Sequence, residues 1–282
     1  MNYPTNLFNL KLPPYKSGLV HNIYRSGGFI LKIAKPSFPD FNNPEHFETE
    51  KNSLRLLRKK GIPVPKKIQT VKLNRNKKTT YGIIETFVRG TQFSWGKLSK
   101  KHLLEIVNLL DCGHKIPVKG AGPLNHCLIG KFTCWKDFLF YSYDRFIEEF
   151  PEKENKNLLF KLKKVTTPKN PLNKNPNSFF LFVDPNPGNV IFNTSSSINA
   201  VIDIDHPYGG DPLYDYASIK WYSPNTFLQL TKLVPFLKSK SSIINFYSFL
   251  HGANVLCWMK RHNLDYRKDL IKLKKLLKTI SV

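Results

Sequence analysis

Residues 179–215 read FFLFVDPNPGNVIFNTSSSINAVIDIDHPYGGDPLYD, and the spacing of polar residues in this stretch is the strongest indication of the fold. Apolar runs of strand-like composition alternate with turn formers, and two prolines and a glycine restrict the loop between the first two runs. Such a loop holds Asp184 and Asn189 at the ends of rigid strands. The strands that we expect here cover residues 179–183, 190–193 and 199–204.

The last two of these strands are expected to pair as an antiparallel hairpin. A hairpin brings its ends together, so Asn189 should lie close to Asp203, which follows the apolar run AVI. Their amide and carboxylate oxygens suit Mg²⁺, and the carboxylate of Asp184 can orient or deprotonate a hydroxyl group. A plain connecting turn would explain DPNPGN alone, but not its combination with AVIDID and GDPLYD at these distances.

The first third of the chain has the composition of a β-sheet with one helix. Residues 19–34 indicate two strands joined by a Gly-Gly turn, and residues 44–60 indicate a helix that Gly61 ends. The remainder is mostly helical, which predicts an α+β fold with a β-rich N-lobe, 1–88, and a helical C-lobe, 89–282. Further strands are expected at 67–73 and 81–87, helices at 100–110, at 135–150 and from 214 onward, and a loop at 165–178.

The composition limits the class of protein. With 44 Lys and Arg against 20 Asp and Glu, the net charge is +24, so nucleic-acid binding is possible, although a genome-wide compositional bias explains the charge equally well. No apolar run is long enough to cross a membrane, and the N-terminus lacks a secretory signal. Four scattered cysteines without a CxxC pair suit a cytoplasmic protein and do not predict a zinc site.

The motifs of the C-terminal half resemble those of the aminoglycoside/choline phosphotransferase family, which has a protein-kinase-like fold. Members carry His-Gly-Asp-x-x-x-x-Asn, then Ile-Asp at a strand end, then Gly-Asp-Pro-x-x-Asp. The resemblance implies that Asp184 is the catalytic aspartate, Asn189 and Asp203 are the metal ligands, and residues 210–215 form a structural segment. The sequence departs from the motif where Phe182 and Val183 replace its His and Gly.

The N-terminal half is also similar to this family. Lys32 lies in the apolar strand FILKIA, where an unpaired ammonium would be costly to bury unless it snorkels to water. The resemblance implies that Lys32 contacts the nucleotide phosphates and pairs with a helix glutamate, for which Glu50 is the first choice and Glu48 the second.

The resemblance also implies the other nucleotide contacts. The segment YGIIETFVRG is similar to the family's inter-lobe hinge, so backbone groups from Glu85 to Val88, including Phe87, would face the adenine. Ser17 and Gly18 occupy the place of the turn that covers the phosphates.

Together these features predict a small-molecule kinase that uses ATP and Mg²⁺ and phosphorylates a hydroxyl group. The sequence from Tyr216 to Val282 contains twelve Lys and Arg residues but only two acids, Asp265 and Asp269. We therefore expect a neutral or anionic acceptor and not a polycationic aminoglycoside. The alternatives are an inactive kinase-like binding module, an antibiotic phosphotransferase, and a basic protein that binds RNA or anionic membranes through the KLKKLLK segment. The sequence does not indicate the oligomeric state.

Overall fold

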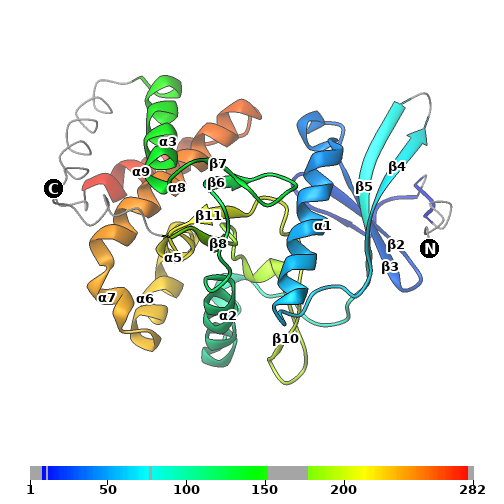
Figure 1. Cartoon of the computed structure of the whole chain (residues 1–282), viewed down its shortest axis with the longest axis horizontal. Helices are drawn as coiled ribbons and strands as arrows, with labels where there is room; N and C mark the ends of the chain where they lie inside the picture. Colours follow the sequence, from blue (N-terminus) through cyan, green and yellow to red (C-terminus); the bar gives the residue numbers. More distant parts are fainter. Residues whose placement is uncertain (1–7, 11, 76–77, 152–176, 279–282) are drawn as a thin grey trace. The chain divides into compact units, whose positions relative to one another are not determined.

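The computed structural model of the protein describes residues 8–10, 12–75, 78–151 and 177–278 (Figure 1). These residues combine an antiparallel sheet with a largely helical part, which confirms the predicted α+β class. The chain forms two compact units. Unit 1 comprises Met1–Ser94, Leu124–Leu128 and Pro187–His206, and unit 2 comprises Trp95–Pro123, Ile129–Asn186 and Pro207–Val282.

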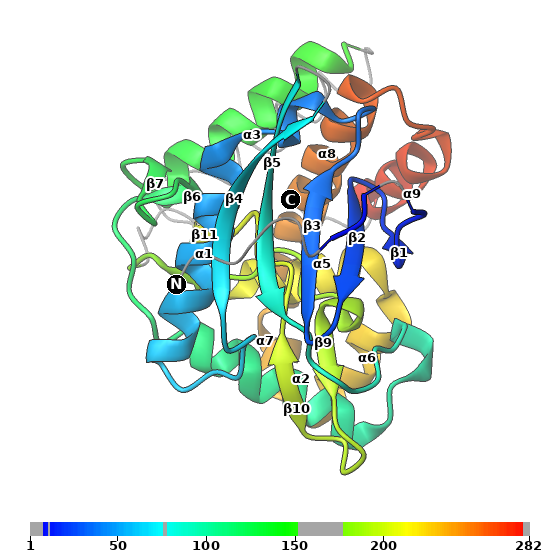
Figure 2. The ribbon, with the colours of Figure 1, turned by 90° about the vertical axis from the view of Figure 1, so that its right-hand side faces the viewer.

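Unit 1 contains an antiparallel sheet with the strand order β1-β2-β3-β5-β4 (Figure 2). The predicted Gly-Gly turn joins β2 to β3, with Ser26 opposite Phe29 and Gly27 in the left-handed region at φ 54°. Glycine adopts this conformation without the steric cost that a Cβ would bring. The strands are β1 Lys16–Ser17, β2 His21–Ser26, β3 Phe29–Ala34, β4 Ile68–Arg75 and β5 Lys78–Thr86.

Helix α1, Pro44–Lys59, packs on β4 and β5 and confirms the predicted helix of this region (Figure 1). The Asn43 side chain caps its first turn by accepting the N–H of Glu45 at 2.9 Å, and Pro44 occupies a position where no N–H is needed. The helix ends before Gly61, which has φ 79°.

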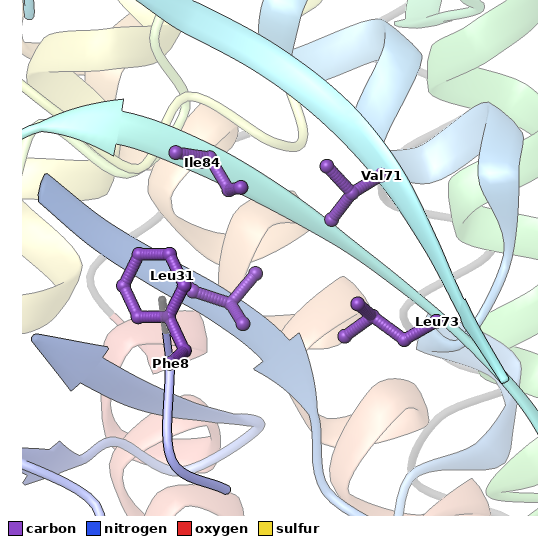
Figure 3. Close-up of a cluster of buried hydrophobic side chains, with 5 residues drawn as sticks. All are labelled: Phe8, Leu31, Val71, Leu73 and Ile84. Carbon is purple, nitrogen blue, oxygen red and sulfur yellow. The ribbon is translucent and has the colours of Figure 1, made fainter. Parts of the chain in front are cut away.

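The other face of the sheet carries a hydrophobic cluster of Phe8, Leu31, Val71, Leu73 and Ile84 (Figure 3). Phe8 packs on side chains from β3, β4 and β5. Successive residues of a strand point to opposite faces of the sheet. Because Leu31 is buried in this cluster, the next residue, Lys32, points to the face that α1 covers.

Unit 1 also includes the predicted antiparallel hairpin, formed by β9, Val190–Phe192, and β10, Ile198–Val201. The short 3₁₀ helix Pro187–Asn189 precedes it. The prediction of a strand through residues 199–204 is wrong for its last three residues. The backbone leaves the extended conformation there, and Asp203 adopts φ 61°.

Unit 2 contains most of a small sheet of order β7-β6-β11-β8 together with several helices, and α8 packs against α3, α5 and α9 (Figure 1). The predicted helices of this part are confirmed, whereas most of the predicted loop at 165–178 lies outside the described residues. Within the described ranges, no helix has both the length and the apolarity that a membrane span requires. The elements are α2 Lys100–Gly113, β6 Ala121–Leu124, β7 Gly130–Phe132, α3 Trp135–Glu149, β8 Phe179–Leu181, β11 Tyr208–Gly210, α5 Leu213–Tyr222, α6 Pro224–Leu233, α7 Phe236–Ser239, α8 Ser241–Arg261 and α9 Arg267–Lys278.

Candidate functional site

A buried lysine held between two carboxylates forms the centre of the site in unit 1. The Nζ atom of Lys32, on β3, lies 2.5 Å from a carboxylate oxygen of Glu50, on α1, and 2.6 Å from Oδ1 of Asp203. Burial alone would lower the pKa of Lys32, but the charges of Asp203 and Glu50 outweigh it and raise the pKa well above its usual value. Lys32 is therefore a fixed cation, as an ion-paired buried ammonium must be.

The helix glutamate that pairs with this lysine is Glu50, the first choice from the sequence. Glu50 is fully buried, whereas Glu48 is directed elsewhere and contacts the hydroxyl of Thr70 and the ammonium of Lys51. Residues two apart on a helix point in different directions, so only one of the two glutamates can reach the strand lysine.

The hairpin of β9 and β10 brings together the two predicted metal ligands. The N–H of Ile202 donates to the backbone oxygen of Asn189 at 2.9 Å, so Asn189 lies beside the residue that precedes Asp203. The side chain of Asp203 is 42% exposed, although Lys32 holds one of its oxygens. A bound cation can therefore still approach this carboxylate.

The donor set of this hairpin fits Mg²⁺. Asp203 offers a carboxylate and Asn189 an amide oxygen, which are hard ligands of the kind that Mg²⁺ prefers. The single ammonium of Lys32 lies between the carboxylates of Asp203 and Glu50, so the acidic groups outnumber it locally. This excess of negative charge favours a divalent cation beside the lysine.

Glu85, near the end of β5, is a buried acid whose carboxylate belongs to this charge cluster. The residue lies between Ile30 and Ile68 in the sheet, and its Oε1 atom is buried without a hydrogen-bond partner. Burial raises the pKa of Glu85 to about 7, against the opposing charge of Lys32 and with the help of Asp203.

We predict that Glu85→Gln stabilises the protein above pH 7 but not below pH 5. A carboxyl with a folded pKa of about 7 binds more protons in the folded than in the unfolded state, so stability falls as the pH rises from about 4.5 to about 7. The variant should gain about 3 kcal/mol in the free energy of unfolding at pH 8. Urea denaturation at pH 5 and pH 8 measures this, with the exposed Glu148→Gln as the control. An equal difference from wild type at both pH values would contradict the prediction.

The remaining predicted nucleotide contacts lie on the same sheet of unit 1. Gly18 lies in the turn between β1 and β2, where its N–H donates to His21 O at 2.9 Å, and Ser17 donates its hydroxyl to Asn22. Val88 follows the end of β5 at Thr86. The N–H of Phe87 donates to Gly28 O at 2.8 Å, so this N–H is not free to bind an adenine.

Asp184 is exposed on a loop of unit 2, and hydrogen bonds to Asp215 hold the backbone of this loop. The preceding residue, Val183, has φ 64°, a conformation that is strained for a β-branched residue. The fully buried carboxylate of Asp215 accepts the N–H of Val183 at 2.7 Å and the N–H of Phe182 at 3.0 Å. These hydrogen bonds stabilise the strained backbone and fix the position from which the side chain of Asp184 extends.

Two residues that support this loop were missed as functional residues. The sequence assigned Asp215 only to a structural segment, and it gave no signal for His114, whose Nε2 lies 2.9 Å from Asp215 Oδ2. Phe182, which replaces the motif histidine, is buried against Gly113, where a Cβ would lie 2.4 Å from its ring. His114, at the end of α2, therefore contacts Asp215 through its imidazole, whereas the phenyl ring of Phe182 occupies the position of the motif histidine.

Comparisons with known proteins give one family. Residues 12–230 match the family described as "Phosphotransferase enzyme family", whereas no curated protein matches the chain. The apo structure of a thermostable mutant of aminoglycoside phosphotransferase APH(4)-Ia has a TM-score of 0.73 at 17% identity, covering 94% of this chain and 92% of that chain. A ternary complex of this enzyme with AMP-PNP and hygromycin B has a TM-score of 0.71 at 16% identity, covering 94% and 90%.

A third solved structure, the complex of APH(2")-IIIa with GDP and kanamycin, has a TM-score of 0.67 at 14% identity and covers 94% of this chain and 91% of that chain. These likenesses confirm the predicted protein-kinase-like fold, and the family match confirms a phosphotransferase. The match covers well over half of the sequence. The chain therefore belongs to the phosphotransferase enzyme family.

Proposed function

We propose that the protein transfers the γ-phosphate of ATP to a hydroxyl group of a neutral or anionic small molecule in a Mg²⁺-dependent reaction. The observation that carries this proposal is the placement of the Lys32 ammonium, 2.5 Å from Glu50 and 2.6 Å from Asp203. A fixed ammonium beside a partly exposed carboxylate can bind phosphate oxygens and a metal ion together, which is the main requirement of phosphoryl transfer.

Each residue has a role that follows from its position. Lys32, braced by Glu50, binds nucleotide phosphates, and Asn189 and Asp203 hold Mg²⁺. The metal, when bound, supplies positive charge that offsets the charge of the phosphates. Asp184, exposed on its loop in unit 2, orients the acceptor hydroxyl and accepts its proton. The turn at Ser17 and Gly18 and the segment from Glu85 to Val88 remain proposed nucleotide contacts, except for the N–H of Phe87, which donates to Gly28 O.

The groups near Asp184 in unit 2 support an acceptor without several positive charges. Tyr222 is 42% exposed, but partial burial and the nearby charges of Asp184 and Asp269 raise its pKa, so the phenol stays neutral and can donate a hydrogen bond. The ring of Tyr222 meets that of His251, whose pKa burial and the charge of Lys272 lower to about 3. Neutral donors of this kind bind hydroxyl and carboxylate groups, whereas a polycation requires several acidic groups.

The proposal is tested by acceptor-dependent ADP release from ATP and Mg²⁺. The panel contains neutral polyols, hydroxy acids, amino alcohols, kanamycin and hygromycin B, with GTP in place of ATP as a second series. We expect a neutral or anionic acceptor to stimulate ADP release at least about tenfold over either aminoglycoside, corresponding to about 1.4 kcal/mol or more in transition-state binding.

One alternative has direct support. The similar solved structures are aminoglycoside phosphotransferases, and Asp269 supplies one acidic group near Tyr222. Efficient phosphorylation of kanamycin or hygromycin B, with kcat/KM above about 10⁴ M⁻¹s⁻¹, would favour an antibiotic phosphotransferase and would contradict the proposed acceptor class.

A further inference from the structure

Three potential metal ligands meet in unit 1 outside the sites described above. His21 begins β2, His46 lies in the first turns of α1, and Asp205 follows β10. The Nε2 atoms of the two histidines are 3.3 Å apart, and Nε2 of His46 lies 3.5 Å from Oδ2 of Asp205. One ligand atom from each of the three residues lies within 4.8 Å of the others.

The two histidines are in the neutral form that binds metal ions. Burial lowers the pKa of His21 to about 4 and that of His46 to about 3, so both imidazoles are neutral at pH 7. Two neutral imidazoles and a carboxylate are a usual donor set for a transition-metal ion.

Hydrogen bonds within the cluster leave lone pairs facing each other. Nε2 of His46 lies near both His21 Nε2 and Asp205 Oδ2, and it carries at most one proton in a neutral ring. If that proton points to Asp205 Oδ2, His46 cannot donate it to His21 Nε2. If it points to His21 Nε2, the lone pairs of His46 Nε2 and Asp205 Oδ2 are not separated by a proton. A single cation placed between the three atoms would satisfy all of them.

We propose that His21, His46 and Asp205 bind a first-row transition-metal dication, with Zn²⁺ as the preferred ion. Tetrahedral Zn²⁺ with Zn–N distances of about 2.0–2.1 Å places its ligand atoms about 3.3 Å apart. The two separations from Nε2 of His46, 3.3 Å to His21 and 3.5 Å to Asp205, are close to that value, and all three ligand atoms lie within 4.8 Å of one another. Two imidazoles and one carboxylate suit Zn²⁺ and leave a fourth position for water, whereas Mg²⁺ prefers oxygen ligands.

The surroundings of the cluster hold its ligands in place. Oδ1 of Asp205 lies 3.1 Å from Nδ1 of His206, which leaves Oδ2 for the metal. The rings of Phe41 and Phe47 lie against His21 and His46 and provide an apolar wall. Such outer contacts orient metal ligands and tune the strength of the site.

The metal would join three segments that are far apart in the sequence. It would tie β2 and α1 to the segment that follows Asp203, and α1 also carries Glu50. We therefore assign the site a positioning role in unit 1, separate from the reaction. The cysteine pattern did not predict a zinc site. The sequence alone also gave no sign of this one, because its three ligands lie in segments that are far apart in the chain.

Metal binding by the wild-type protein is the first test. Tag-free protein is dialysed against EDTA and titrated with Zn²⁺ in competition with a chromophoric chelator, and with Co²⁺ while visible d–d absorption is recorded. We expect one Zn²⁺ per chain with a Kd below about 1 μM, a tetrahedral Co²⁺ spectrum, and no displacement by excess Mg²⁺. A Kd weaker than about 0.1 mM would overturn the proposal, whatever the variants do.

Variants then locate the ion. His46→Gln and Asp205→Asn should each weaken Zn²⁺ binding at least about 100-fold and abolish the Co²⁺ spectrum. The control, His262→Gln in unit 2, should bind as wild type does. Circular dichroism and thermal unfolding establish that each variant is folded. Binding that is unchanged in both cluster variants would place the ion elsewhere and would overturn the proposal, even if the protein proves to be an active kinase.

Discussion

Asp184→Asn is expected to lower kcat for phosphoryl transfer by about 10²–10⁴-fold, the range attributed to one general base. Asparagine has the size of aspartate but cannot accept the acceptor's proton at neutral pH. The loop should keep its conformation, because the bonds that hold it run from the backbone of Phe182 and Val183 to the carboxylate of Asp215. The expected loss is therefore chemical and not structural.

The measurement is acceptor-dependent ADP release by the wild type and the variant, together with ATP affinity from thermal shifts with Mg²⁺. Nucleotide affinity should change by less than about threefold, because Asp184 is proposed to act on the acceptor. The control is Asp144→Asn, an exposed aspartate on α3 of the same unit. Acceptor-dependent ADP release that is equal in Asp184→Asn and the wild type would contradict the prediction, and its absence from both proteins would favour a kinase-like binding module.

Much of the fold is predictable from local sequence patterns. The Gly-Gly turn at residues 27–28 and the helix capped by Asn43 depend on residues that are neighbours in the chain, and both were predicted correctly. The hairpin after Asn189 was also predicted, because apolar runs on either side of a polar turn favour pairing. The end of its second strand was wrong, because alternating apolar residues do not reveal the left-handed conformation of Asp203.

The site was only partly predictable for a different reason. Burial of a lysine in an apolar strand indicated a partner for Lys32, and the resemblance to the phosphotransferase family implied that this partner is a helix glutamate, with Glu50 as the first choice. The bond between His114 and Asp215 joins residues 101 positions apart, and neither lies in a pattern that indicates the contact. The cluster of His21 and His46 has the same origin, since separate elements bring together residues that look unremarkable in the sequence.

Asp203→Asn is expected to lower kcat/KM for ATP by about 10³-fold and to raise the Mg²⁺ concentration needed for half-maximal activity at least about tenfold. The amide keeps one oxygen ligand but loses the negative charge that attracts the metal. Lys32 should remain in place, because it stays paired with the buried carboxylate of Glu50. The control for unit 1 is the exposed Asp40→Asn, which should show wild-type kinetics and Mg²⁺ dependence.

A double-mutant cycle with Lys32→Met distinguishes a shared site from two independent ones. The two side chains are 2.6 Å apart and are proposed to act on the same phosphates, so the combined loss should be smaller than the product of the single losses. Lys32→Met alone should weaken ATP binding, because it removes the only ammonium that faces Glu50 among the described residues. If the losses multiply fully, and the Mg²⁺ requirement of Asp203→Asn equals that of wild type, then Asp203 does not hold the metal beside this lysine.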